Sequence, residues 1–397
     1  MLRIATIGTS PITSDFIEAV AASPDAVFVG TLSRDAERAG TFTAERAGTL
    51  PFTELEALAA SDAVDAVYIG SPNALHAPQA LACIAGGKHV LVEKSFASNK
   101  REARAVFDAA ERAGVVALEA MRPLHDPAFV ACRDAVAKVG RVRRASLHLG
   151  SYSSRYDELK AGRHTNIFDC AMASGALMDM GVYTVEPLIE FFGAPESITA
   201  VPVLLDEGTR GLTNGALDGA GTIIARYADH VASLHWSKIS NDELPSQVEG
   251  EDATLTFAGT SEPAWLRIRY RGTVQRSSAK QARTAGAPHI EERDLEPVEN
   301  SMVFELADFV TAVNATRSGT PALDAPAGAL GCVRHFRDVT LASLALMDEA
   351  RRQMGVHFPA DEALTPQGVA SAGRVAAPLR RRRPAPAPSH PRSEEAR

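Results

Sequence analysis

The chain has 397 residues, of which 45% are hydrophobic and 23% charged, and its 41 Lys and Arg against 49 Asp and Glu give a net charge of −8. This composition excludes a collagen-like chain, a wholly disordered chain and a small disulfide-rich scaffold, and the length suggests two or three domains. No stretch of about 18 apolar residues predicts a membrane span, and four scattered cysteines without a CxxC pair favour the reducing cytoplasm.

The charge is unevenly distributed along the chain. From Arg374 onward there are seven arginines and two glutamates, a charge of +5, so the −8 of the whole chain leaves −13 for the rest. An acidic body argues against nucleic acid as the main partner. The tail, taken as residues 363–397, is rich in Pro and Arg and is expected to be disordered, because it cannot build a core.

Short apolar runs alternate with helical patterns over the first part of the chain. The runs that predict strands are 3–7, 27–32, 66–70, 89–92 and 115–119, and the helical patterns are 13–22, 34–47, 55–60, 76–85 and 100–113. This alternation predicts an α/β fold, a doubly wound parallel sheet of the Rossmann type, over residues 1–122. Ligands of such sheets bind at the carboxyl ends of the strands.

The pattern changes in the second part of the chain, for which we expect an α+β domain over residues 123–362. Alternating runs at 143–149, 222–227, 231–236, 254–257 and 265–270 predict a large, mostly antiparallel open sheet. Helices are expected near 175–192, 303–318 and 329–353, followed by a short strand near 356–358. A cleft between the two domains is the expected site.

The turn after the first strand is a candidate phosphate-binding turn. Gly8, Thr9, Ser10 and Ile12 lie between a strand and a helix, and Ser10 and Thr13 stand where a dinucleotide fingerprint has its second and third glycines. The helix N-terminus would still present N–H groups to a pyrophosphate. The alternative is a plain turn, and the motif alone is weak.

The end of the second strand bears on the choice of cofactor. Ser33 and Arg34 stand where NAD-binding Rossmann proteins place an acidic residue on the ribose. A hydroxyl and a guanidinium suit a 2′-phosphate, which favours NADP over NAD. NAD stays possible if Asp35 turns inward, and Arg34 could instead be a solvated residue of the helix.

Polar residues follow the third and fourth strands. Ser71, Asn73 and His76 come after the third, and Glu93 and Lys94 come directly after the fourth. Charges that follow a buried apolar run must be satisfied at the carboxyl edge of the sheet, where the reactive ring of a cofactor would lie.

Four stretches together resemble the Gfo/Idh/MocA oxidoreductase family, named for glucose–fructose oxidoreductase and inositol dehydrogenase. They are the turn at Gly8, the run from Ser71 to His76, the run from Gly87 to Lys94, and the run from Ser174 to Tyr183. The resemblance covers roughly residues 1–360. It departs from the family at Ser95, where proline is usual, at Ser174, where glycine is common, and in the missing second glycine of the turn.

The resemblance implies roles for individual residues. Lys94 would contact substrate and cofactor, Tyr183 would be the acid/base for the substrate hydroxyl, and Asp179 would help to position the substrate. Asn73 and His76 would line the nicotinamide side. The family also implies a homodimer or homotetramer formed through the open sheet.

The spacing and the chemistry of these residues are consistent with the roles that the resemblance implies. Asp179 and Tyr183 are spaced i, i+4 and share one face of a helix. A tyrosine with an ordinary pKa of about 10 is a poor base near neutrality, and the Lys94 ammonium would lower that pKa. The alternative is that Tyr183 is a core residue and Asp179 a helix cap.

Two further residues are weaker candidates for the substrate. Asn166 precedes the glycine-rich helix and is either a substrate contact or a turn residue. Arg122 follows the fifth strand and either reaches the cleft or forms a salt bridge between domains. No metal site is expected, because the nicotinamide carries the redox chemistry.

The sequence therefore predicts an NAD(P)-dependent oxidoreductase that acts on the CH–OH group of a small-molecule sugar, inositol or related polyol, with NADP preferred. One alternative is a non-catalytic, NADP-binding sensor of the same fold. Another is an enzyme that reduces an imine or enone, which would not need Lys94, Asp179 and Tyr183 together.

Overall fold

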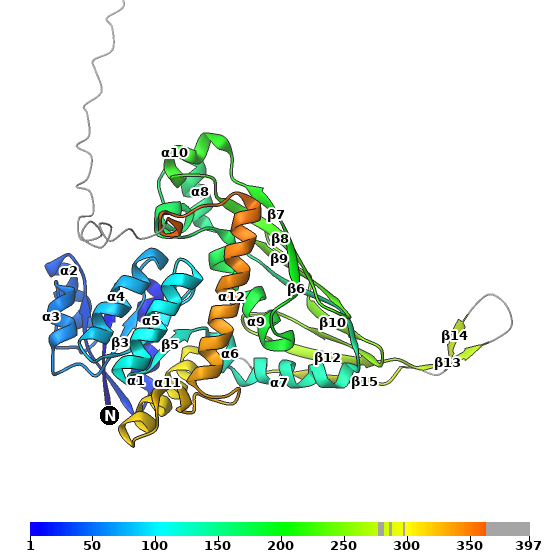
Figure 1. The fold of residues 1–397 in the computed structure, drawn as a ribbon, viewed down its shortest axis with the longest axis horizontal. Helices are drawn as coiled ribbons and strands as arrows, with labels where there is room; N and C mark the ends of the chain where they lie inside the picture. The colour runs from blue at the N-terminus through cyan, green and yellow to red at the C-terminus, as the bar shows by residue number, and fades with distance from the viewer. Residues whose placement is uncertain (277–281, 286–287, 297, 363–397) are drawn as a thin grey trace, which may run out of the picture. The chain divides into compact units, whose positions relative to one another are not determined.

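A computed structural model gives the fold and describes residues 1–276, 282–285, 288–296 and 298–362. Two sheets organise these residues (Figure 1). The predicted tail, residues 363–397, lies outside the described residues. Among the residues that are described, no helix is both long and apolar enough to cross a membrane.

The first sheet is parallel and five-stranded, in the order β2-β1-β3-β4-β5. Its strands are β1 (Leu2–Ile7), β2 (Ala26–Leu32), β3 (Ala66–Ile69), β4 (His89–Glu93) and β5 (Ala117–Ala120). The chain moves outward from β1 to β2 and then returns to the other side of β1 at β3, so the direction of winding reverses between β1 and β3. The carboxyl ends of these two strands border the crevice where such sheets bind ligands.

Five helices connect and cover these strands, as the alternating pattern predicts. They are α1 (Pro11–Ala22), α2 (Ala36–Glu45), α3 (Leu55–Ala60), α4 (Asn73–Ala85) and α5 (Lys100–Ala113). Local chemistry sets several of their ends. The Asp35 carboxylate caps α2, the Asn99 side chain caps α5, and Gly114 ends α5 in the left-handed conformation.

The second sheet has eight strands in the order β15-β12-β11-β10-β6-β9-β8-β7. It is antiparallel except for the parallel pair β6 and β9, which confirms the mostly antiparallel sheet. The strands are β6 (Val142–Gly150), β7 (Ser197–Leu204), β8 (Asp218–Arg226), β9 (Val231–Ser237), β10 (Ser246–Gly250), β11 (Ala253–Phe257), β12 (Trp265–Tyr270) and β15 (Ile290–Asp294). Strands β13 (Thr273–Arg276) and β14 (Ala282–Ala285) pair with each other as a separate hairpin that projects from the sheet (Figure 1).

Seven helices complete the described part of this second region. They are α6 (Arg122–His125), α7 (Pro127–Val136), α8 (Ser154–Lys160), α9 (Val182–Phe192), α10 (Arg210–Thr213), α11 (Met302–Arg317) and α12 (Val333–Met354). The long helix α12 lies between the two sheets and packs against α9 and β7 on one side and α5 and β5 on the other (Figure 1).

The prediction of a short strand near 356–358 is wrong. Val356 and Phe358 are buried, which explains the apolar pattern, but the segment joins neither sheet. Its N–H groups are satisfied locally: that of Val356 donates to the Arg351 carbonyl and that of Phe358 to the Asp361 carboxylate.

A cluster of buried polar groups ties this segment to the rest of the fold. The Arg351 side chain, only 3% exposed, donates to Asp361 at 2.6 and 3.0 Å and to Asp348 at 2.8 Å. The Lys100 N–H donates to Asp348, and the Asn99 amide donates to the Ala360 carbonyl. The cluster therefore joins the beginning of α5 to the end of α12.

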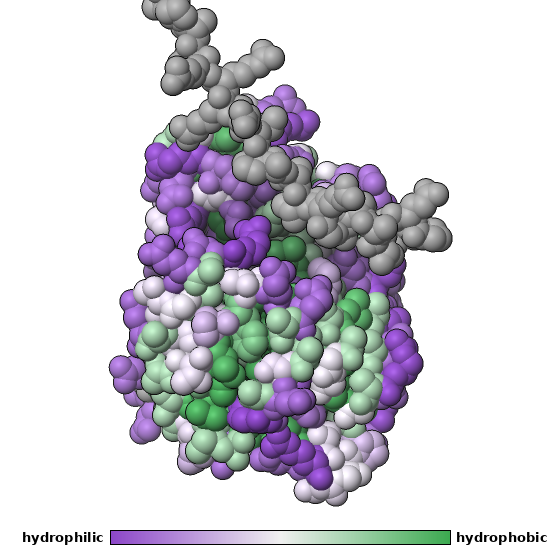
Figure 2. Space-filling view, turned by 90° about the vertical axis from the view of Figure 1, so that its left-hand side faces the viewer, coloured by the Kyte–Doolittle hydropathy of each residue, from purple (hydrophilic) through white to green (hydrophobic). Residues whose placement is uncertain are grey.

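Figure 2 looks onto the side of the molecule where α2, α3 and α4 lie, and its surface there carries hydrophobic residues interspersed among hydrophilic ones. Leu81 of α4, 36% exposed, is one of the few large apolar side chains exposed in this half. Scattered apolar residues are ordinary on protein surfaces. The candidate site lies elsewhere, between the two sheets.

Candidate functional site

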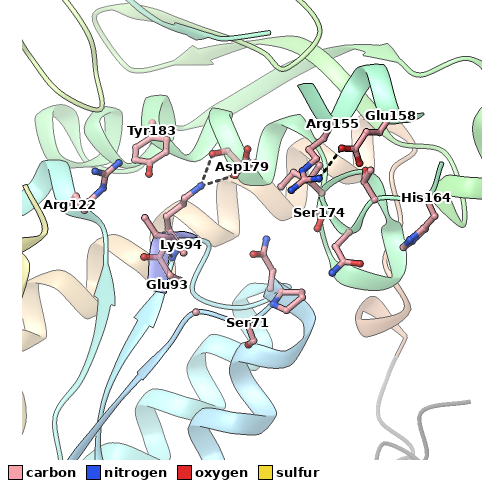
Figure 3. A pocket seen from close by; sticks show the side chains of 17 residues that line it. Ser71, Glu93, Lys94, Arg122, Arg155, Glu158, His164, Ser174, Asp179 and Tyr183 are labelled. Carbon is pink, nitrogen blue, oxygen red and sulfur yellow. Dashed lines mark hydrogen bonds and ion pairs between the residues drawn. The ribbon is translucent and has the colours of Figure 1, made fainter. Parts of the chain in front are cut away.

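A pocket of about 640 Å³ lies where the carboxyl ends of β3 and β4 face the second sheet (Figure 3). Arg122 and Tyr183 lie at one end of it, and Arg155, Glu158 and His164 at the other (Figure 3). Its lining combines both halves of the fold: Ile12, Gly70, Ser71, Pro72, Asn73, Glu93, Lys94, Arg122, Arg155, Glu158, His164, Thr165, Asn166, Ile167, Ser174, Asp179 and Tyr183.

The turn after β1 has the geometry of a phosphate-binding turn. Gly8 has φ +105°, and a Cβ there would lie 2.9 Å from the Gly70 carbonyl oxygen, so the position requires glycine. Ser10 occupies the N-cap of α1, and its side chain caps no helical N–H but lies 3.1 Å from the Thr13 hydroxyl. Because no acidic side chain stands in the first turn of α1, its N–H groups suit an anion, and a dinucleotide fits here.

Thr13 explains how the turn works without its third glycine. Its side chain is fully buried, and a Cβ on Gly70 would lie 2.8 Å from the Thr13 hydroxyl. The close approach between helix and strand that the fingerprint assigns to a glycine of the turn is provided here by Gly70, at the end of β3.

The residues after β3 divide between the pocket and the core. Ser71 and Asn73 line the pocket, and the Asn73 amide donates to the Ala173 carbonyl across the cleft. His76 does not line it: the ring is fully buried, with its nitrogens 2.9 Å from the Ser95 carbonyl oxygen and 2.7 Å from that of Ser71. Burial lowers the pKa of His76 to about 4. His76 thus joins two loops behind the site, and its contact with the cofactor stays a prediction.

Glu93, at the end of β4, is buried and hydrogen-bonded. Its carboxylate accepts from the Tyr68 hydroxyl at 2.6 Å and from the Lys94 N–H at 3.2 Å. Burial raises the pKa of Glu93, and Lys94 opposes that rise. Ser95, which replaces the proline usual in the family, donates from its hydroxyl to the Met178 carbonyl at 2.8 Å and so ties β4 to the segment that carries Asp179.

Asp179 lies between two ammonium groups. Lys94 Nζ donates to Asp179 Oδ1 at 2.8 Å and to the Asp179 carbonyl at 3.0 Å, and Lys238 Nζ donates to Asp179 Oδ2 (Figure 3 shows the Lys94 contact). Burial would raise the pKa of Asp179, but Lys94 and Lys238 hold it well below its usual range. Burial would likewise lower the pKa of Lys94, but Asp179, Tyr183 and Glu93 raise it above its ordinary value. The carboxylate and Lys94 are therefore both charged at neutral pH.

Tyr183 lies one turn along from Asp179, with its ring centroid 4.9 Å from Lys94 Nζ. Burial raises the pKa of Tyr183 above its ordinary value of 10.0, and Lys94 and Arg122 offset part of that rise. The Lys94 ammonium acts on the pKa of Tyr183 in the direction that the sequence predicts, but burial outweighs it in this structure. Arg122 also donates to Glu262 at 3.1 Å and to the Ser301 hydroxyl at 3.4 Å, so it both lines the pocket and forms a salt bridge.

Tight packing against the second sheet fixes the helix that carries Asp179 and Tyr183. Its first turn is a π-helical segment, η4 (Leu177–Gly181), which continues as α9; such segments are frequent at functional sites. A Cβ on Gly181 would lie 3.3 Å from the Trp236 indole, so glycine permits this approach. The buried Asp218 carboxylate accepts from the Leu177 N–H and the Trp236 indole N–H, which anchors the start of the segment to β8 and β9.

The far end of the pocket is polar and includes two pairs of interacting polar side chains. Arg155 donates to Glu158 at 2.9 Å, both from α8, and His164 Nε2 lies 2.7 Å from Asp169 Oδ2. Asn166 lines the same end. This wall offers hydrogen-bond donors and acceptors without a large net charge.

Ser33 and Arg34 lie at the end of β2, outside this pocket, and Arg34 is exposed. The Asp35 carboxylate accepts from the Arg38 N–H at 3.0 Å and thus serves as the cap of α2. Arg38 has its guanidinium 3.5 Å from the Thr9 carbonyl, beside the phosphate-binding turn. Arg38 is therefore a second arginine, in addition to Arg34, near the end of β2, where the sequence predicts recognition of the cofactor.

The structure brings Lys94, Asp179, Tyr183, Asn73, Asn166 and Arg122 into one pocket. Lys238, Arg38 and the α8 residues Arg155 and Glu158 were not predicted from the sequence. Arg38 follows Arg34 by four positions on the predicted helix, which is a usable signal. Lys238 directly follows β9, as Lys94 follows β4, but nothing in its neighbourhood in the sequence relates it to Asp179.

No group of three or more His, Cys, Asp or Glu side chains is arranged to hold a metal ion within residues 1–276, 282–285, 288–296 and 298–362. The four cysteines are unpaired thiols, and three of them are buried.

Comparison with protein families gives two matches in succession. Residues 2–120 match the model described as an oxidoreductase family with an NAD-binding Rossmann fold, and residues 129–256 match the Gfo/Idh/MocA C-terminal domain. The two matches correspond to the first sheet and to the beginning of the second region.

Among curated proteins, scyllo-inositol 2-dehydrogenase (NADP+) IolU of Bacillus subtilis is 36% identical over 364 residues, which cover 91% of this chain and all of that protein. D-xylose 1-dehydrogenase (NADP+) 2 of Haloferax volcanii is 36% identical over 169 residues, 42% of this chain and 50% of that protein. Among solved structures, a 3-ketoreductase from Actinomadura kijaniata in complex with NADP and TDP-benzene aligns with a TM-score of 0.71 at 22% identity, covering 90% of this chain and 99% of that one, a likeness of fold.

Proposed function

The chain belongs to the Gfo/Idh/MocA family of oxidoreductases, and on that premise we propose that it transfers a hydride between NADP and a carbinol or carbonyl carbon of an inositol, a sugar or a related polyol. The observation that supports this most strongly is the placement of Lys94, Asp179 and Tyr183 in one pocket at the carboxyl edge of the parallel sheet. The NADP-dependent relatives named for scyllo-inositol and D-xylose support the substrate class.

Each group then has a defined task. When bound, the nicotinamide ring of the cofactor supplies or accepts the hydride. Tyr183 Oη takes the proton from the substrate hydroxyl, or returns it in the reverse direction. The Lys94 ammonium favours the phenolate of Tyr183, and Asp179 holds Lys94 in place. Gly8, with the first turn of α1, receives the pyrophosphate.

The direct test mixes the purified protein with NADP+ and a panel of polyols that includes scyllo-inositol, myo-inositol and D-xylose. Turnover is followed by the absorbance of the reduced nicotinamide, with NAD+ in a parallel series. Oxidation of at least one member with NADP+ is expected. Tight binding of NADPH without turnover of any member, in either direction, would instead support the non-catalytic sensor.

The proposed preference for NADP rests on the end of β2. Ser33 and Arg34 directly follow β2, whose Leu32 carbonyl accepts from the Gly8 N–H at 3.2 Å. The Arg38 guanidinium lies beside the phosphate-binding turn, and Asp35 is engaged as a helix cap. Guanidinium groups are strong donors to phosphate oxygens.

Replacing Arg38 with Leu should weaken NADP+ binding by about ten- to a hundredfold, because a hydrogen bond to a charged group contributes roughly 1.5–3 kcal/mol. Binding of NAD+ should change by less than about threefold, since it lacks the 2′-phosphate. Isothermal titration calorimetry with NADP+ and with NAD+ measures the two affinities. Arg112→Leu, an exposed arginine at the end of α5, is the control. Equal loss for both cofactors would show that Arg38 does not discriminate through the 2′-phosphate.

We also propose that the chain assembles as a homodimer or homotetramer through the outer face of the eight-stranded sheet. Val201 and Val203 of β7 and Ile224 of β8 are 61%, 54% and 42% exposed on this sheet, and exposed apolar groups of this size favour burial in an interface. Light scattering on the purified protein measures the mass directly. Localisation of the protein in the cytoplasm stays a prediction.

A further inference from the structure

Lys238 holds Asp179 from the side opposite Lys94. It directly follows β9 in the second sheet, and its side chain is only 13% exposed. Its Nζ contacts Asp179 Oδ2, whereas Lys94 Nζ, from the end of β4, contacts Oδ1. The two oxygens of one carboxylate are thus divided between ammonium groups from the two sheets.

The backbone of Lys238 is fixed independently of its side chain. Its N–H donates to the Gly219 carbonyl at 2.8 Å, and its carbonyl accepts from the Ser153 N–H at 3.0 Å. Ser153 is the N-cap of α8, which carries Arg155 and Glu158 into the pocket. A substitution at position 238 therefore removes the ammonium group while the hydrogen bonds that place β9 and α8 remain.

The charges explain what this arrangement achieves. Two ammonium groups and one carboxylate give the three residues a net charge of +1, whereas Lys94 and Asp179 alone would be neutral. Lys94 is the member of the three that lies next to Tyr183, with Nζ 4.9 Å from the ring centroid. Tyr183 also faces Lys94 and Glu93 from β4, Arg122 from α6 and Tyr68 from β3. Arg122, which also pairs with Glu262, favours the phenolate of Tyr183 together with Lys94, whereas Glu93 opposes it.

We propose that Lys238 is a positioning residue that holds Asp179 and keeps Lys94 from being neutralised, so that a positive charge remains to favour the phenolate of Tyr183. This role rests on the proposed function of Tyr183 as acid/base. Lys238 acts through the ion triad Lys94–Asp179–Lys238 and not through contact with the substrate, because it does not line the pocket.

The test measures the ionisation of Tyr183 directly. Protein labelled with ¹³C at the tyrosine Cζ is saturated with NADP+ and titrated upward from about pH 7 until Tyr183 ionises or the protein unfolds, and the signal of Tyr183 is assigned with the Tyr183→Phe variant. In Lys238→Met the pKa of Tyr183 should rise by about one unit, because removal of a nearby cation disfavours the phenolate. Lys238→Arg should restore the wild-type value.

Turnover gives a second readout. With a polyol that the wild type oxidises, Lys238→Met should lower kcat by about tenfold near neutral pH and recover activity as the pH is raised, since a one-unit pKa shift changes the phenolate fraction about tenfold. Lys138→Met is the matched control, because Lys138 forms an ion pair of 2.7 Å with Glu291 far from the pocket; it should change neither readout. Lys238→Gln replaces the Met variant if circular dichroism shows that the latter does not fold.

An unchanged pKa of Tyr183 in a folded neutral variant overturns the proposal. A loss of activity that no rise in pH restores, together with an unchanged pKa, would show that Lys238 only supports packing. If the pKa of Tyr183 shifts as expected while the wild type oxidises no member of the polyol panel, the positioning role stands and the proposed function is wrong.

Discussion

The Tyr183→Phe variant is expected to lose about 10²- to 10⁴-fold in kcat, the usual contribution of a positioned acid/base. Phenylalanine keeps the ring beside Lys94 and the packing of α9, so only the hydroxyl that is proposed to exchange the proton is removed. Affinity for NADPH should change by less than about threefold, because no phosphate-binding group is altered. Steady-state kinetics and a fluorescence titration on the same preparation measure both quantities.

Tyr227→Phe provides the control for this variant. Its hydroxyl donates to the Gly193 carbonyl at the end of α9, outside the pocket, so it loses one phenol hydroxyl without touching the site. Turnover by Tyr183→Phe at the wild-type rate would reject Tyr183 as the acid/base. It would leave Lys94, whose Nζ lies 4.9 Å from the Tyr183 ring centroid, as the group to test next.

The Arg351→Met variant is expected to lose about 3–5 kcal/mol of unfolding free energy, the usual cost of breaking a buried ion pair. Arg351 is 3% exposed and binds both Asp348 and Asp361, so its removal leaves two carboxylates without their main partner. The stacking of its guanidinium on Phe358, 4.1 Å from the ring centroid, is lost as well. Urea unfolding followed by circular dichroism measures the change.

The neighbouring Arg352 gives the comparison on the same helix. It is 68% exposed and pairs with Glu349, so Arg352→Met should change the stability by no more than about 1 kcal/mol. Equal effects of the two variants would mean that the buried cluster contributes no more than a surface pair. The two substitutions remove the same charge from adjacent positions, so net charge cannot account for a difference.

The first sheet was predictable because its strands are buried on both faces. β3 and β4 are continuous apolar runs, and turns or helix caps separate them from their helices. The second sheet was predictable only where one face is buried. β7 contains Pro202 and exposes Val201 and Val203 at the sheet edge, and β15 is largely charged, so neither shows a clear alternation. Strand β10, with its polar sequence, was missed for the same reason.

The site shows the same division between local and long-range information. Lys94 follows a strand, and Asp179 and Tyr183 share a helix turn, so each has a local signal. The contact of Lys238 with Asp179 depends on the packing of Trp236 against Gly181, which brings the end of β9 to Asp179, and the local sequence does not predict it. The burial that raises the pKa of Tyr183 likewise depends on the packing of the two halves against each other, which no single stretch of sequence predicts.

The sharing of Asp179 between two lysines bears on how such proteins diversify. Lys94 belongs to the cofactor half, whereas Asp179, Tyr183 and Lys238 all belong to the other half. A recombination event that replaced the second half would keep the charge balance at the reaction centre only if the incoming segment brought its own carboxylate together with the lysine that holds it. An exchange of the second half would therefore preserve this arrangement of charges only if it carried Asp179 and Lys238 together.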